Sequence, residues 1–446
     1  MPFRAHAPQQ RIWISYDGKA LAASKGEPVA ASLLAAGRLA IARSTKFHRP
    51  RGPACLRGAC DGCLARVDGE PNVMTCMVPA HDGMTIDSQN TLGSKNLDLL
   101  RVTDWFFPHG MNHHELLAGI PGAQGVMQAF ARRVAGLGRL PSTELRPRQA
   151  HRRHADVVVV GCGPAGMAVA SALAASGRSV EVVDDAVRGG GGLRALSGER
   201  SLWSKVDAPF HASVSNQSVV VRSSTVAGGV FGEDLLVVGS AGAEVVTAED
   251  VVFATGAHDG VALFEGNDVP GVMSARAAGL LLAEGVVVGR RAVVIAGSGG
   301  FGRAFARASA GLCEVVFASG APQVLRVRGN AAVRAVVLKE GDVEREVAAD
   351  ALLLDEPRAP AYELCLQAGA QLEHQPRGFV VKTDEDGRIR DRLWAVGEVK
   401  GTPFEPDAIL EDAGRVARAI QSSRSAPKSA SPPATATKSN VPSKMK

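Results

Sequence analysis

The chain has 446 residues, of which 46% are hydrophobic and 21% are charged, and its formal net charge is +5. That length predicts two to four domains, and the composition is typical of a globular protein with a buried core. The small positive charge, part of it in the C-terminal tail, argues against a nucleic-acid partner. No apolar run is long enough to span a membrane, and the first residues lack a signal-peptide core, so we expect a cytoplasmic location.

The first 90 residues carry the pattern of a small β-rich module. Residues Arg11 to Ser15 alternate between polar and apolar, and Asp17-Gly18 then predicts a tight turn and a hairpin. The stretch from Glu27 to Ala36 is rich in Ala and Leu and has a helical pattern. With the cysteine-rich loop that follows, these elements predict a β-grasp, ferredoxin-like module over residues 1–90.

Four of the seven cysteines lie in this module, with the spacing C-x4-C-x2-C and a fourth further on: Cys55, Cys60, Cys63 and Cys76. This is the ligand spacing of plant-type [2Fe–2S] proteins. Gly58 and Gly62 allow the backbone to fold around the sulfurs and to aim N–H groups at them. Structural zinc is the main alternative, although zinc sites usually pair two short cysteine knuckles. Unligated thiols are a further alternative, and a disulfide is weaker still without a secretory signal.

Two stretches here carry a family resemblance. The run from Phe47 to Gly52, together with Gly69-Glu-Pro-Asn72, resembles the N-terminal module of the heterotetrameric sarcosine oxidase alpha subunit. The four cysteines resemble the related cluster-bearing subunits of hydrogen cyanide synthase, opine oxidases and hydroxyproline dehydrogenases. In the sarcosine oxidase branch, the resemblance implies a module without a cluster. This chain has all four ligand positions.

Residues 91–153 have a less regular pattern, and we expect them to connect the module to the next domain. His113 and His114 suggest a metal or proton-relay site. Adjacent positions diverge on a regular element and no acidic cluster accompanies them, which favours ordinary linker residues. A helical pattern runs from Gln128 to Leu137.

The next segment has the order of a dinucleotide-binding fingerprint: strand, glycine turn, helix, strand and terminal acid. Asp156 to Val160 predicts a buried strand, and Ser179 to Val183 a second strand that ends at Asp184. In this pattern the first glycine permits the turn, the second admits the pyrophosphate, and the third lets the helix pack closely. The acid is placed to accept hydrogen bonds from ribose hydroxyls. The expected binding residues of this part are Gly161, Gly163, Pro164, Ala165, Gly166 and Asp184.

Three further stretches resemble flavoproteins of the pyridine-nucleotide-disulfide reductase type and imply that FAD binds here. The glycine run that ends at Leu193 follows the second strand, Val251 to Gly256 resembles the second strand–turn signature, and Leu393 to Glu398 the C-terminal one. Glu398 stands where the family usually has Asp, whose side chain hydrogen-bonds the ribityl chain. The resemblance adds the FAD-binding residues Gly191, Gly192, Leu193, Thr255, Gly256, Gly397 and Glu398.

A second strand–glycine–helix pattern begins at Arg291, where this fold binds NAD(P), with Gly297, Gly299 and Gly302 as expected binding residues. The following strand ends at Ala318-Ser319 without a ribose-binding acid, and no arginine pair marks a 2′-phosphate site. Bound NAD and a retained scaffold without nucleotide are both compatible with this pattern.

The expected fold is α/β plus a small α+β module: a β-grasp ferredoxin-like module followed by a Rossmann-like flavoprotein reductase fold with two dinucleotide-binding domains. Residues 423–446 are rich in Ser, Pro, Ala, Thr and Lys, and we expect them to be disordered. The expected boundaries are 1–90 (ferredoxin-like), 91–153 (connector), 154–272 (first FAD-binding part), 273–374 (inserted NAD(P)-type domain), 375–422 (second FAD-binding part) and 423–446 (tail).

FAD and a [2Fe–2S] cluster in one chain predict an oxidoreductase that passes electrons between a two-electron and a one-electron centre. The resemblance implies a subunit of a heteromeric amine or amino-acid oxidase or dehydrogenase, whose partner is a D-amino-acid-oxidase-like flavoprotein. The alternatives are a self-contained NAD(P)H-dependent reductase and a scaffold subunit that has lost its cofactors. Cys162, Cys313 and Cys365 are scattered, which argues against a dithiol mechanism and favours buried structural thiols. The sequence shows no nucleophile–base arrangement, so catalytic residues are unknown.

Overall fold

The computed structural model describes residues 3–44, 47–89, 149–289, 291–295, 300–318 and 323–425, with a few positions between 91 and 126. Most of the expected connector, including His113, His114 and the helical pattern at 128–137, therefore lies outside the described residues. So do the residues from 426 onward, which make up most of the expected tail.

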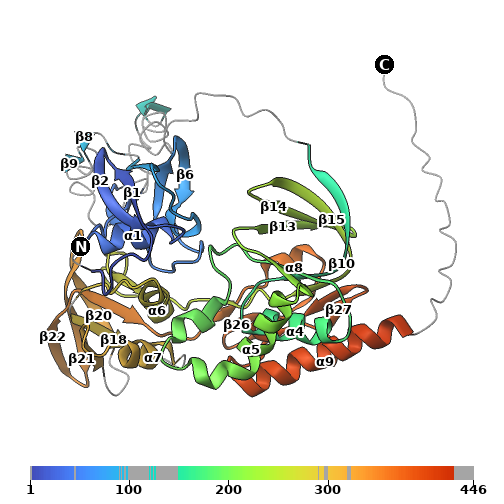
Figure 1. The fold of residues 1–446 in the computed structure, drawn as a ribbon. Coiled ribbons are helices and arrows are strands. Elements are labelled where there is room, and N and C mark those ends of the chain that lie inside the picture. The colour runs from blue at the N-terminus through green and yellow to red at the C-terminus, as the bar shows by residue number, and fades with distance from the viewer. Residues whose placement is uncertain are drawn as a thin grey trace.

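The N-terminal module is a five-stranded sheet covered by one helix, coloured blue in Figure 1. β1 (Arg11–Tyr16) and β2 (Lys19–Ser24) form a hairpin whose turn residues, Asp17 and Gly18, both have positive φ, as a type I′ turn requires. The strand order is β2-β1-β7-β5-β6, with β1 and β7 parallel and the other pairs antiparallel. This mixed sheet confirms the β-grasp prediction. The other elements are α1 (Val29–Ala35), β3 (Ala42–Arg43), β4 (Pro50–Arg51), β5 (Leu64–Val67), β6 (Glu70–Met74), η1 (Thr75–Met77), β7 (Thr85–Asp87), β8 (Gly93–Ser94) and β9 (Leu97–Asp98).

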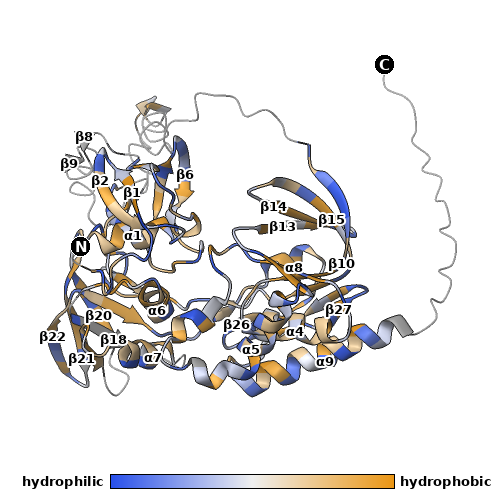
Figure 2. Cartoon of the chain, viewed as in Figure 1, coloured by the Kyte–Doolittle hydropathy of each residue, from blue (hydrophilic) through white to orange (hydrophobic). Residues whose placement is uncertain are grey.

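The larger part contains the dinucleotide-type sheet. Its strands run in the order β12-β11-β10-β15-β14-β13, and β28 pairs with β15 in parallel. The buried valines at the end of β10 form the centre of the sheet, and Figure 2 shows that the first half of β10 is hydrophilic. The elements are β10 (His151–Val160), α4 (Pro164–Ala175), β11 (Val180–Val183), η3 (Gly191–Leu196), η4 (Arg200–Trp203), α5 (Ser204–Ser215), β12 (Val219–Arg222), β13 (Val226–Phe231), β14 (Asp234–Gly239), β15 (Gly242–Phe253), β27 (Arg388–Arg390), β28 (Leu393–Ala395), η5 (Gly397–Lys400) and α9 (Pro406–Ser425).

A second, smaller parallel sheet is inserted between β15 and β28. Its order is β17-β23-β18-β19, and a three-stranded antiparallel meander, β20-β21-β22, accompanies it. Two further strand pairs, β16 with β24 and β25 with β26, come from the segments that connect the two larger sheets in sequence. The elements are β16 (Ala257–His258), β17 (Val272–Ser274), α6 (Ala275–Ala283), β18 (Arg291–Ile295), α7 (Phe301–Ala308), β19 (Glu314–Ala318), β20 (Gln323–Gly329), β21 (Val333–Glu340), β22 (Val343–Ala348), β23 (Ala351–Leu354), β24 (Ala359–Pro360), α8 (Glu363–Gln367), β25 (Leu372–Gln375) and β26 (Gly378–Val381).

Three of the expected domain boundaries cut through strands. β10 starts at His151, five positions before the expected Asp156, so the boundary at 153/154 falls inside it. The boundaries at 272/273 and 374/375 fall inside β17 and β25. α9 also continues to Ser425, beyond the expected end at 422. Residue patterns show that a strand exists, but they do not fix where it begins and ends, because pairing in the sheet decides its length.

The N-terminal module packs directly onto the rest of the chain. Ala31, Leu34 and Ala35 of α1 belong to the same buried cluster as the core of α4 and α6. The segment before β1 bridges the two parts, because Val287 N donates to the Phe3 carbonyl and Phe3 N donates to that of Ala35. Among the described residues, no helix is both long and apolar enough to cross a membrane.

Candidate functional site

The four predicted cluster ligands come together at one end of the N-terminal module. Cys55, Cys63 and Cys76 are buried, and Cys60 is half-buried. They meet as two pairs: Cys55 Sγ lies 3.4 Å from Cys60 Sγ, and Cys63 is hydrogen-bonded to Cys76. Within the described residues, no three metal-ligating side chains converge on a single point. Two thiols for each of two irons is the arrangement that a four-cysteine [2Fe–2S] cluster uses.

Backbone N–H groups of the loop point at the sulfurs. Ala59 N lies 3.3 Å from Cys55 Sγ, and Gly58 N lies 3.4 Å from Cys76 Sγ. Gly58 has φ +70°, and a side chain at Gly62 would lie 1.9 Å from the carbonyl oxygen of Gly52. Both glycines are therefore required by the course of the loop. Such N–H groups stabilise negative charge on sulfur and so suit thiolate ligands.

Within each pair, one thiol favours the ionised form of the other. The hydrogen bond from Cys55 lowers the pKa of Cys60 to about 5, and the bond from Cys76 lowers the pKa of Cys63. These hydrogen bonds, together with burial, raise the pKa values of Cys55 and Cys76. Because the thiolate is the ligand form, each pair offers one thiol that is readily deprotonated. The donor set and its surroundings fit a two-iron cluster.

The glycine turn after β10 has a distinct geometry at each of its three glycines. Gly161 has φ +106°, and a side chain at Gly166 would lie 1.9 Å from the carbonyl oxygen of Gly161. A side chain at Gly163 would meet no atom within 4 Å, so Gly163 borders open space. That space lies at the N-terminus of α4, where backbone N–H groups favour a phosphate. The turn thus fits the pyrophosphate of a dinucleotide.

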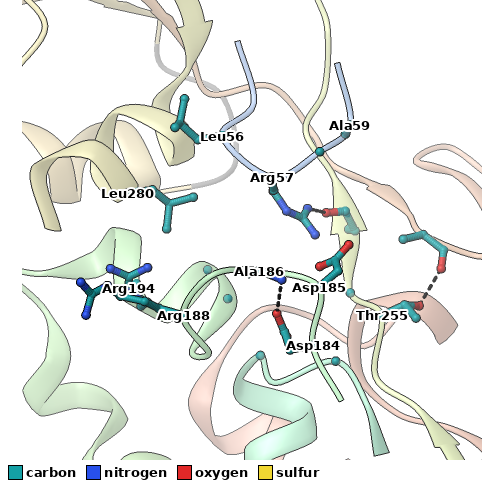
Figure 3. Close-up of a pocket in the computed structure, with 18 of the residues that line it drawn as sticks. Leu56, Arg57, Ala59, Asp184, Asp185, Ala186, Arg188, Arg194, Thr255 and Leu280 are labelled. Atoms are coloured by element: carbon teal, nitrogen blue, oxygen red, sulfur yellow. Dashed lines mark hydrogen bonds between the residues drawn. The ribbon is translucent and has the colours of Figure 1, made fainter. Parts of the chain in front are cut away.

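Asp184, directly after β11, is hydrogen-bonded to this turn. Its carboxylate accepts from the N–H groups of Cys162 and Ala186, the latter at 2.9 Å (Figure 3). Burial raises the pKa of Asp184 to about 6, against the lowering effect of these hydrogen bonds. The carboxylate lines the pocket, as its expected role toward ribose requires.

Most of the expected FAD residues line one pocket, and the others lie in the packing behind it. A side chain at Gly397 would lie 2.5 Å from Ala165 Cβ, and Leu193 is fully buried. The expected residues that line the pocket are Gly161, Gly163, Pro164, Asp184, Gly191, Gly192, Thr255, Gly256 and Glu398. Four expected FAD residues do not line the pocket: Ala165, Gly166, Leu193 and Gly397.

Glu398 is buried and paired. Arg358 Nη2 lies 2.8 Å and Arg358 Nε lies 3.0 Å from Glu398 Oε1. The Arg358 guanidinium also lies over the rings of Phe301 and Phe404, 4.8 and 4.9 Å from their centroids. The sequence pattern predicts Glu398 but gives no sign of Arg358, because the two residues are 40 positions apart and belong to different parts of the fold.

The cluster loop forms part of the wall of the same pocket. Leu56, Arg57, Gly58 and Ala59 line it together with Cys76 and the glycines of the turn after β10. Figure 3 shows Leu56, Arg57 and Ala59 on the blue ribbon of the N-terminal module, opposite Asp184 and Thr255. The sequence could not place the cluster relative to this pocket, since their relative position depends on how the module docks.

The second glycine turn is only partly described, because Gly297 and Gly299 lie outside the described residues. Gly302, in the first turn of α7, donates its N–H to Asp355 Oδ2 at 2.9 Å. Asp355 is buried and follows β23 directly. A carboxylate therefore occupies the helix N-terminus that would otherwise face a phosphate.

Two of the three remaining cysteines are buried, as expected. Burial raises the pKa values of Cys162 and Cys365 to about 12 in each case, which makes them unreactive. Cys313 is half-buried, so the expectation of a buried thiol is wrong there.

The fold and the site define a class of protein: a two-domain dinucleotide-binding flavoprotein fold joined to a ferredoxin-like cluster module. Residues 9–91 match the model of the 2Fe-2S iron-sulfur cluster binding domain, and residues 155–340 match that of pyridine nucleotide-disulphide oxidoreductases. The chain thus contains a 2Fe-2S domain and an FAD-binding domain of the pyridine nucleotide-disulphide oxidoreductase type.

More specifically, the chain is similar in sequence to sarcosine oxidase alpha subunits. It is 28% identical to the alpha subunit of sarcosine oxidase from Rhizobium meliloti (strain 1021) over an alignment of 404 residues, and the match covers 80% of this chain and 41% of that protein. It is 27% identical to an opine oxidase subunit from Agrobacterium tumefaciens (strain Ach5), over 55% of this chain and 61% of that protein. The matched region therefore spans less than two thirds of the length of either relative.

The fold resembles a solved structure over nearly the whole chain. The crystal structure of L-proline dehydrogenase from P. horikoshii has a TM-score of 0.71 and 23% sequence identity, and the similarity covers 95% of this chain and 76% of that one. At this identity the likeness shows the fold alone.

Proposed function

We propose that this chain is the FAD- and [2Fe–2S]-bearing electron-transfer subunit of a heteromeric oxidoreductase that acts on amines or amino acids. The main support is that the cluster loop and the dinucleotide glycines line a single pocket. The homology to sarcosine and opine oxidase subunits supports the heteromeric assembly and the substrate class. We further propose a cytoplasmic complex in which the partner is a D-amino-acid-oxidase-like flavoprotein that oxidises the C–N bond.

FAD accepts electrons in pairs and the cluster carries single electrons, so the two together would link two-electron oxidation to one-electron transfer. The chain's own residues would hold and orient these groups. The two thiol pairs would bind the irons, and the glycine turn, Asp184 and Glu398 would bind the dinucleotide. The backbone N–H groups of the cluster loop stabilise charge on the sulfurs.

Asp355 favours this function over a self-contained NAD(P)H reductase. A reductase of that kind needs an anionic nucleotide at the N-terminus of α7, where the Asp355 carboxylate already accepts the Gly302 N–H. A pyrophosphate there would face a buried carboxylate at close range, and the repulsion between like charges disfavours binding.

The test is anaerobic reduction of the purified chain, followed by visible and EPR spectroscopy. We expect NADH alone to leave the flavin oxidised. We expect an amine substrate with the copurified partner to bleach the flavin and to give the EPR signal of a reduced cluster. Copurification from the native host should yield a second flavoprotein. Rapid bleaching by NADH alone, or full substrate turnover by this chain alone, would contradict the proposal, and colourless protein would exclude both redox functions.

A further inference from the structure

The residues between Cys55 and Cys60 belong to two sites at once. Their backbone holds the sulfurs, whereas Leu56, Arg57 and Ala59 line the dinucleotide pocket. Figure 3 shows Arg57 extending from this loop toward the strand that carries the Ala257 carbonyl. The loop is thus shared between the cluster site and the pocket.

Arg57 brings a positive charge into the pocket. Its guanidinium donates to the carbonyl oxygen of Ala257, directly after Thr255 and Gly256. Arg276 Nη2 donates to the same oxygen at 2.9 Å, but Arg276 is also paired with Asp259 at 2.7 Å. Arg57 forms no ion pair with any acidic side chain that the structure describes.

The charge of Arg57 affects its neighbours. Burial lowers the pKa of Arg276 to about 10, and the adjacent Arg57 acts in the same direction. Arg57 also opposes the rise in the pKa of Asp185 that burial causes. Arg57 and Arg276 thus place two guanidinium groups at one carbonyl oxygen, in a pocket that Asp184 and Asp185 also line.

The conformation of the loop depends on the residues around it. Leu56 has φ +54°, a left-handed conformation that is unfavourable for leucine. Two contacts hold the loop in this conformation. Cys55 Sγ contacts Cys60 Sγ, and Ser274 N donates to the Ala54 carbonyl at 2.9 Å. Binding of iron by Cys55 and Cys60 would fix both ends of the segment that carries Arg57.

We propose that Arg57 is a positioning residue of the dinucleotide site, and that it couples the occupancy of the cluster site to the affinity for the dinucleotide. The loaded cluster fixes the loop, and the loop then holds the Arg57 guanidinium in the dinucleotide pocket. By thermodynamic linkage, bound dinucleotide stabilises the cluster by the same factor. This inference rests on the proposed function, because it takes both cofactors as ligands of this chain.

The test compares affinities of FAD-free protein for FAD and for ADP, which carries the pyrophosphate without the isoalloxazine. Calorimetric titrations under anaerobic conditions use the full chain with its cluster loaded and after removal of iron by a chelator. We expect the loaded wild type to bind both probes about tenfold more tightly than the iron-free protein. We expect Arg57→Ala to lower both affinities of the loaded protein about tenfold and to make them independent of the cluster. Arg57→Lys should retain part of the affinity.

Arg66→Ala is the matched control, since Arg66 lies in the same module on β5 and does not line the pocket. It should behave as the wild type. Equal affinities of loaded and iron-free wild type would overturn the coupling. An unchanged ADP affinity in the loaded Arg57→Ala variant would overturn the role of Arg57 in the dinucleotide site, and this comparison does not depend on how the iron-free loop folds. Failure of FAD to bind any of these proteins would instead contradict the proposed function.

Discussion

At the scale of single residues, the three glycines of the turn after β10 serve different physical needs. Gly166 allows backbone to approach backbone, because a side chain there would lie 1.9 Å from the Gly161 carbonyl oxygen. Gly163 has φ −81°, which any residue can adopt, and it borders open space. The fold therefore requires Gly166, whereas Gly163 is required only by a ligand.

This difference predicts that Gly163→Ala leaves the apoprotein stable but weakens FAD binding. The added methyl group meets no protein atom, so the free energy of unfolding should change by no more than about 0.5 kcal/mol. It would occupy space next to the proposed phosphates, and we expect a loss of about tenfold or more in FAD affinity. Denaturant unfolding and FAD titration measure the two effects.

Gly166→Ala is the comparison for this experiment. The clash with backbone should destabilise the apoprotein by about 2 kcal/mol or more. If Gly163→Ala bound FAD with the affinity of the wild type, the assignment of the pyrophosphate to this turn would be wrong.

At the scale of elements, the ends of strands and helices position the polar groups of the site. Asp184 joins the end of β11 to the turn between β10 and α4, through the N–H group of Cys162. Asp355 joins the end of β23 to the first turn of α7, through the N–H group of Gly302. The two halves of the fold thus each place a carboxylate near the glycine turn, but after different strands: Asp184 follows the strand after the helix, whereas Asp355 follows β23, on the other side of β18. In the first half that carboxylate borders the pocket, and in the second it caps the helix.

The raised pKa of Asp184 predicts a pH dependence of stability. The folded protein keeps this proton up to about pH 6, whereas the unfolded chain loses it near the ordinary aspartate pKa of 3.8. Between these values the folded state binds more protons, so the contribution of Asp184 to stability falls as pH rises and is constant above about pH 6. Unfolding of the apoprotein should be measured from about pH 4 to about pH 7 in wild type and in Asp184→Asn, and the stability of the wild type relative to the variant should fall by roughly 2 kcal/mol. A difference that does not change with pH would refute the raised pKa.

At the scale of the whole molecule, docking of the N-terminal module brings the two cofactor sites together. Arg4 Nη1 lies 2.8 Å from Glu27 Oε2 in the module and donates to the Glu284 carbonyl at the end of α6. The side chains of Arg4 and Glu27 are 7% and 1% exposed, so this ion pair is shielded from water. On the other side of the interface, Arg51 pairs with Asp268.

Arg4→Ala should therefore destabilise the N-terminal module and weaken its contact with the end of α6. It leaves the Glu27 carboxylate buried without its cation, which costs about 3 kcal/mol. We expect a lower midpoint of thermal unfolding and faster proteolysis of the module. Arg152→Ala is the control, since the Arg152 side chain is 63% exposed and its pair with Asp234 should contribute less than about 1 kcal/mol. Equal effects of the two substitutions would show that Arg4 does not hold the module in place.

The sequence predicted most of the elements and the chemistry of the cluster and FAD sites. Cysteine spacing predicted the cluster ligands, because their local loop follows from nearby glycines, and the order of strand, glycine turn and acid predicted the dinucleotide turn. Only the tertiary structure decided the relations between these parts. It paired Glu398 with Arg358, placed Asp355 at the second turn and brought Arg57 of the cluster loop into the pocket. These contacts join residues far apart in the chain. Local periodicity and spacing carry no information about them, since they arise from how the sheets pair and how the module packs.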